Sequence, residues 1–165
     1  MMSAVWVRGL AVSLWFAGAL TATPVWAVPP AAPVERLHAL FDAAWQRDLR
    51  DDPIAASYYG DTRFNDRWPD LSPAARERIR AADQQVLVDL ATIPIQRLPA
   101  PERLNHELFR REYESRIEAA RFHAEYFTMT AHDGVQTLNE VAENMPFDSV
   151  ADYEIWLKRI EAAPA

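Results

Sequence analysis

Apolar side chains recur at helical spacing along most of the chain. The first stripe lies on one face of a helix and comprises Leu37, Leu40, Phe41, Ala44, Trp45 and Leu49. A second follows Ser72, with Ile79, Ala82, Val86 and Leu90. No segment keeps the strict alternation of apolar and polar residues that marks a half-buried strand. The pattern therefore predicts an all-α fold.

Residues that favour helix N-termini stand where these stripes begin. The candidates are Asp51 or Asp52 before Pro53, Ser72 before Pro73, and Ser149 three residues before Asp152. The helix opened by Pro53 is expected to stop near Gly60, and residues 61–71 read as a loop. A short helix is expected at 138–143 after an irregular stretch at 128–137. The final helix carries the stripe Val150, Tyr153, Leu157 and Ile160.

The longest helix is predicted over residues 101–127. Its apolar stripe comprises Leu104, Leu108, Phe109, Tyr113, Ile117, Ala120, Ala124 and Phe127. Its outer face is expected to carry the acid-first pairs Glu107–Arg111 and Glu112–Arg116, four residues apart.

Residues 1–27 have the composition of a cleavable export signal. Arg8 supplies the positive start, Gly9–Leu20 is apolar and too short for a comfortable membrane span, and Ala27 ends a small-residue cleavage site. An uncleaved membrane anchor is the alternative, because a single arginine is a weak positively charged segment for an export signal. Residues 28–33 form a proline-rich leader, and residues 34–165 form the helical segment. The expected location is periplasmic or secreted.

The composition and net charge exclude several kinds of site and partner. The chain has 24 acidic against 17 basic residues, a net charge of −7, and no cysteine. A disulfide scaffold or a thiolate metal site is therefore impossible. Because no basic run is present, nucleic acid is not an expected partner, and no membrane partner is expected after signal cleavage.

The four histidines do not form a recognisable metal motif. His106-Glu107 resembles the start of a zinc-protease helix, but Arg110 occupies the place of the second histidine, so a solvated helix face is expected there. His123 has poor ligand spacing to Glu118, and His38 reads as structural. His132-Asp133 lies in a loop that reads as a surface turn. We predict no catalytic, cofactor-binding or metal-binding residue within this chain.

The remaining candidates for chemistry are serines and a loop rich in aromatic residues. Ser57, Ser72, Ser115 and Ser149 lack a Ser-His-acid context, and two of them are explained as helix caps. Residues 58–68 interleave aromatic side chains with Arg and Asp. This composition suits either a binding surface or a loop anchored to a larger body, and we favour the anchor.

Several ordered segments resemble one known family. They are Asp52-Pro53, Arg63-Phe64-Asn65-Asp66, Trp68-Pro69-Asp70-Leu71-Ser72-Pro73, Arg103-Leu104-Asn105, Glu118-Ala119-Ala120-Arg121-Phe122 and Met145-Pro146-Phe147 before Val150-Ala151-Asp152-Tyr153. In order and spacing, this set resembles the N-terminal part of the bacterial domain-of-unknown-function 885 family, over roughly residues 34–163. The family's Asn-Gln-and-glycine stretch is replaced here by Thr128–Gly134.

The resemblance implies a larger, mostly helical, exported protein of metallopeptidase type. Family members carry an H-E-x-x-P-G-H-H motif far downstream, whose histidines and glutamate would hold zinc and act as general base. That motif is absent from this sequence, so zinc is implied for full-length members and no cofactor for this chain. The implied partners are the missing C-terminal region or, in the full-length form, a peptide substrate.

Two functions remain open from the sequence. The chain is either the N-terminal helical segment of an exported metallopeptidase-like protein, truncated in this sequence, or a non-catalytic periplasmic helical module that binds a partner. In the first case Trp45, Tyr58, Phe64, Trp68 and several apolar stripes are expected to leave an exposed apolar patch. The downstream DNA discriminates between the two, because only the first predicts the H-E-x-x-P-G-H-H motif there.

Overall fold

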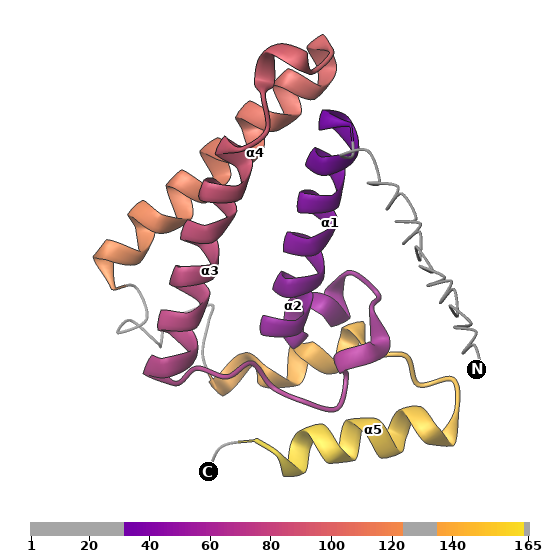
Figure 1. Ribbon diagram of the computed structural model, residues 1–165. Coiled ribbons are helices and arrows are strands. Elements are labelled where there is room, and N and C mark those ends of the chain that lie inside the picture. The colour runs from indigo at the N-terminus through magenta and orange to yellow at the C-terminus, as the bar shows by residue number, and fades with distance from the viewer. Residues whose placement is uncertain (1–31, 124–134, 164–165) are drawn as a thin grey trace, which may run out of the picture. The chain divides into compact units, whose positions relative to one another are not determined.

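The described residues form helices only. The computed structural model describes residues 32–123 and 135–163, and within these ranges there is no strand, so the predicted all-α class is confirmed. The α-helices are α1 (Pro33–Asp51), α2 (Pro53–Tyr58), α3 (Pro73–Ala91), α4 (Ala100–Ala119) and α5 (Val150–Glu161) (Figure 1). Short 3₁₀ segments are η1 (Thr62–Phe64), η2 (Ile95–Arg97), η3 (Ala120–Phe122) and the longer η5 (Val135–Asn144).

Side-chain caps start three of the α-helices where the sequence placed them. Asp52, rather than Asp51, caps α2 by accepting hydrogen bonds from the backbone of Ile54 and Ala55. Ser72 caps α3, and Ser149 forms a reciprocal capping box with Asp152 at the start of α5. The chain leaves α2 at Gly60, whose φ of +79° lies in the left-handed region that glycine adopts without strain.

Helices α1, α3 and α4 share a core. Figure 1 shows α3 and α4 side by side as a hairpin joined through η2. One buried cluster comprises Leu37, Leu90, Ile93 and Leu98, and a second comprises Ala44, Val86 and Tyr113. Phe109 packs against both clusters and lies 4.5 Å from Phe41, centroid to centroid. The predicted stripes of α1 and α3 therefore do face the core, except that Trp45 is 44% exposed.

Helix α4 is shorter than predicted, and only part of its predicted stripe, which includes Phe109 and Tyr113, is covered. It ends at Ala119 and passes through η3 to His123, whose φ of +50° cannot continue a helix. Leu104 and Leu108 are 60% and 58% exposed, whereas His106 is buried. The expectation of a solvated His106 was therefore wrong, because α4 packs through the His106–Phe109–Tyr113 side. Residues 124–127 of the predicted helix lie outside the described residues.

Helix α5 presents its apolar stripe outward. Val150, Tyr153, Leu157 and Ile160 are each about half exposed or more, whereas Arg159 is completely buried. Of the aromatic residues expected in an exposed patch, Trp45 and Tyr58 are exposed, whereas Phe64 is buried and Trp68 is partly buried. The predicted short helix at 138–143 falls within η5. No helix among the described residues is long and apolar enough to cross a membrane.

Candidate functional site

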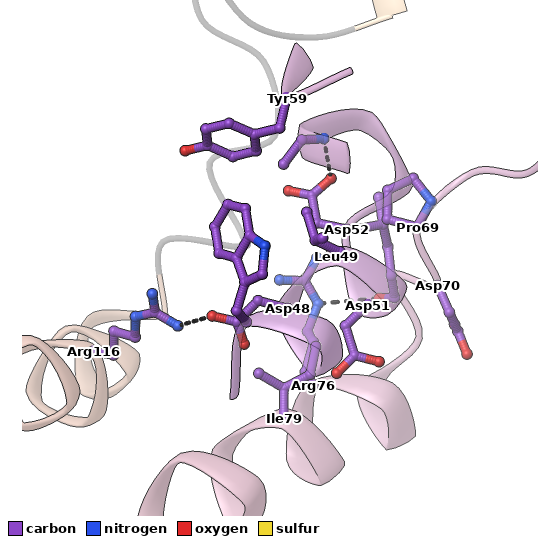
Figure 2. A pocket seen from close by; sticks show the side chains of 13 residues that line it. Asp48, Leu49, Asp51, Asp52, Tyr59, Pro69, Asp70, Arg76, Ile79 and Arg116 are labelled. Carbon is purple, nitrogen blue, oxygen red and sulfur yellow. Dashed lines mark hydrogen bonds and ion pairs between the residues drawn. The ribbon is translucent and has the colours of Figure 1, made fainter. Parts of the chain in front are cut away.

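A groove with a volume of about 440 Å³ lies where the end of α1 meets α2, the start of α3 and Arg116 of α4 (Figure 2). Its size falls in the range of small-molecule and peptide subsites. We call it the acidic groove, because four aspartates and two arginines line it. The lining residues are Trp45, Asp48, Leu49, Asp51, Asp52, Ala55, Tyr59, Pro69, Asp70, Leu71, Arg76, Ile79 and Arg116.

Two aromatic side chains line the groove while remaining accessible to solvent. The ring centroids of Trp45 and Tyr59 are 4.8 Å apart in an edge-to-face arrangement. Tyr59 is 68% exposed, although aromatic residues of this size are usually largely covered. Paired, exposed aromatic faces favour contact with a ligand through stacking or cation–π interaction.

The groove's aspartates are already engaged in holding the local structure. Asp52 and Asp70 each accept backbone N–H groups, Asp70 from Ser72. The hydrogen bond from the Ser72 backbone lowers the pKa of Asp70. Asp48 accepts from Arg47 at 2.6 Å and from Arg116 at 2.7 Å, the latter contact drawn in Figure 2. Asp51 lies 3.8 Å from Arg78. Hydrogen bonds therefore orient the carboxylates of Asp48, Asp52 and Asp70.

A buried ion network behind the groove joins α1, α3 and α4. Arg47 of α1 donates to Asp83 of α3 at 2.7 Å and to the Tyr113 hydroxyl of α4 at 3.3 Å. Burial raises the pKa of Asp83, and the charge of Arg47 opposes that rise. Burial alone would lower the pKa of Arg116, but its hydrogen bonds to Asp48 and Glu112 outweigh burial and raise it. The network therefore keeps its arginines charged and locks the helices in register.

The histidines singled out from the sequence are not brought together. His38 contacts Glu102 at 3.0 Å, and the hydrogen bond to His38 is the largest cause lowering the pKa of Glu102. His106 is buried with neither ring nitrogen hydrogen-bonded, and His123 ends η3. His132-Asp133 lies outside the described residues. Within the described ranges, no three His, Asp or Glu side chains lie close enough to hold a metal ion.

The serines and the aromatic loop have structural roles. Ser72 and Ser149 are caps, as predicted, and the buried Ser57 hydroxyl contacts Asn65 at 2.8 Å. In the loop, Phe64 and Asn65 are buried, and the Trp68 indole N–H donates to the Arg159 carbonyl at 2.5 Å. The second half of residues 58–68 is thus anchored, as the favoured interpretation predicted, and Tyr59 lines the groove.

Sequence reasoning missed the charged residues that organise this region. Arg47, Asp83 and Arg159 belong to no motif, and each contacts a residue on another helix. Arg116 was expected in its pair with Glu112, which is present, but its contact with Asp48 of α1 was not. The one available signal for Arg159 was its place four residues after Ile155 and three after Trp156, which puts a charged residue on the same helix face as two apolar ones. That signal does not identify a partner.

Comparison with known proteins identifies the family. No curated protein and no solved structure matches the chain. Residues 53–165, most of the chain, match the family described as "Bacterial protein of unknown function (DUF885)". The match begins at the proline that opens α2 and includes the groove's Tyr59, Asp70, Arg76 and Arg116. The chain therefore belongs to the DUF885 family of bacterial proteins.

Proposed function

We propose that this chain is the N-terminal helical segment of an exported, metallopeptidase-like protein, and that it contributes a peptide-binding groove rather than catalytic residues. The acidic groove is the observation that carries the proposal. Its exposed Trp45–Tyr59 pair offers a stacking surface, and its four aspartates outnumber its two arginines. A peptide segment with aromatic or basic side chains matches this surface in shape and charge.

The state of the groove's carboxyl groups supports binding over chemistry. A general acid needs a pKa near the working pH, whereas the pKa of Asp70 is lowered. Asp48 accepts a hydrogen bond from Arg116, and Asp52 accepts a backbone N–H at the start of α2. The groove thus presents acceptor groups that hydrogen bonds hold in place, which suits binding. Family membership supports the larger assignment, in which zinc chemistry belongs to residues outside this chain.

The first test measures zinc binding and hydrolysis by the mature chain. Calorimetry with zinc should show no tight one-to-one binding, since a catalytic site needs about three protein ligands held by supporting contacts. A peptidase assay with casein digest peptides should show no activity that a chelator removes. Tight zinc binding or chelator-sensitive hydrolysis would contradict the assignment of the chemistry to residues outside this chain.

The second test concerns the groove, with two neighbouring tyrosines as a matched pair. Tyr59→Ala removes a side chain that lines the groove, whereas Tyr58→Ala removes a neighbouring aromatic side chain, 53% exposed, that does not line it. Fluorescence anisotropy with labelled casein digest peptides should show weaker binding for the first variant alone. Equal binding by both variants would count against the groove. The alternative function, a non-catalytic periplasmic module, shares this binding result but predicts no metallopeptidase motif downstream.

A further inference from the structure

Arg159 is a buried cation without a counter-ion. Its side chain is 0% exposed, and among the described residues no carboxylate forms an ion pair or hydrogen bond with it. Burial lowers the pKa of Arg159, and the charges of Asp52 and Asp66 only partly oppose this. Asp52 is committed to the cap of α2, and Asp66 to Arg67. A buried charge left unpaired is unfavourable and calls for a specific explanation.

The guanidinium group is nevertheless firmly oriented. Its Nη1 donates to the Ser57 hydroxyl at 2.9 Å and lies 3.5 Å from the sulfur of Met145. Its carbon lies 4.9 Å from the centre of the Trp68 ring, a cation–π arrangement. The Trp68 N–H also holds the Arg159 carbonyl. These contacts fix one end and one face of the group.

The opposite edge of the same guanidinium is unused. Neither Nε nor Nη2 of Arg159 has a hydrogen-bond partner, and both atoms are enclosed. This edge carries two parallel N–H groups, the geometry that matches the two oxygens of a carboxylate. Among the described residues, three other arginines direct this edge at a carboxylate, with both donors reaching one oxygen: Arg47 at Asp48, Arg63 at Asp61 and Arg110 at Glu107.

We propose that the Nε–Nη2 edge of Arg159 is a binding site for a carboxylate group, which enters when the side chains enclosing this edge move apart. The ligand selects the opened conformation, because only there do both donors gain a partner. Ser57 and Trp68 hold the guanidinium plane in place, so the edge is oriented before binding. This site is separate from the acidic groove and does not rest on the proposed function.

Thermal unfolding of the mature chain tests the proposal with defined carboxylates. The probes are sodium acetate, trialanine with a free carboxyl terminus, and trialanine amide, each against sodium chloride of equal ionic strength. A ligand that binds only the native state raises its midpoint temperature. Acetate or free trialanine should raise this temperature above that in chloride, and trialanine amide should not. If only acetate raises the midpoint temperature, the site takes a small carboxylic acid. If only free trialanine raises it, the site takes the carboxyl terminus of a peptide.

Two lysine variants assign the effect to Arg159. Arg159→Lys keeps the positive charge and removes the two-donor edge. Carboxylate should therefore no longer raise the midpoint temperature of unfolding. Arg78→Lys is the matched control, because Arg78 is exposed and makes only a 3.8 Å contact with Asp51, so its response should persist. A full response in Arg159→Lys, or an equal response to trialanine amide, would overturn the proposal. So would unfolding that is the same in all carboxylates and chloride.

A measurement on the unaltered chain covers the case in which Arg159→Lys does not fold. The Nε–H signal of Arg159 can be assigned by nuclear magnetic resonance from its proximity to the Trp68 ring. Titration with the active carboxylate should shift this signal in a saturable way, while the Nε–H signal of Arg78 stays in place. An Arg159 signal that does not move during titration would refute binding at this edge.

Discussion

At the scale of single residues, polar side chains inside the molecule distinguish this chain from a simple helical core. His106 and Arg159 are both buried with nitrogen atoms that lack a partner, whereas Asp83 is buried but paired with Arg47. Buried polar groups are normally hydrogen-bonded, so the unpaired ones reduce the free energy of unfolding. They are retained at the expense of stability, which makes them the first residues to test.

His106→Leu should leave the chain folded and raise its stability. The substitution removes two buried nitrogens without a hydrogen bond, although one of them lies 4.0 Å from the Glu107 carboxylate, and it fills a similar volume with apolar atoms, a gain of about 1 kcal/mol in the free energy of unfolding. Urea unfolding measures the effect. The control is His38→Leu on α1, where the lost contact with Glu102 is at the surface and should change stability by less than about 0.5 kcal/mol. Strong destabilisation by His106→Leu would mean that the imidazole has a partner.

At the scale of helices, the sequence located the amphipathic stripes correctly, but only some of these stripes face the core. Those of α1 and α3 face the shared core, whereas Leu104 and Leu108 of α4 and the stripe of α5 are exposed. The aromatic row Phe41–Phe109–Tyr113 explains the difference for α4, because packing these rings turns Leu104 and Leu108 away.

Two leucines of the α3–α4 hairpin test which faces are buried. Leu90→Ala in α3, where the side chain is 1% exposed, should lower the free energy of unfolding by about 2–5 kcal/mol. Leu104→Ala in α4 should change it by no more than about 0.5 kcal/mol, because most of that side chain already contacts solvent. Urea denaturation of the two variants side by side gives the comparison. Similar losses would show that the Leu104 face is covered.

At the scale of the whole molecule, the chain is an acidic, all-helical member of the DUF885 family. Among the described residues, the stripe of α5 and the acidic groove leave apolar or aromatic side chains exposed. The export signal proposed for residues 1–27 would place those surfaces in the periplasm.

Mass spectrometry of the periplasmic fraction tests the proposed export. The mature protein should begin at Val28, because Ala27 ends a small-residue cleavage site after an apolar stretch. A variant with Ala27→Arg should accumulate uncleaved, since a large charged side chain does not fit the position before the cut. Full-length protein found only in the membrane fraction would instead support an uncleaved anchor.

The sequence by itself determined the features that depend on neighbouring residues. Helix starts at Asp52, Ser72 and Ser149 followed from caps that act within three residues, and the 3.6-residue period determined the all-α class. The family followed from ordered segments along the chain. The acidic groove was only hinted at, through the aromatic residues around Tyr59.

Only the tertiary structure decided which faces are buried and which charges meet. Arg47 and Asp83 are 36 residues apart in sequence, and Arg159 and Ser57 are 102 apart. No local pattern encodes such pairs, because they depend on how one helix packs against another. A stripe of apolar residues indicates only that burying that helix face is favourable. Whether it is covered depends on competition with the other faces, and on α5 the face that carries Arg159 is the buried one.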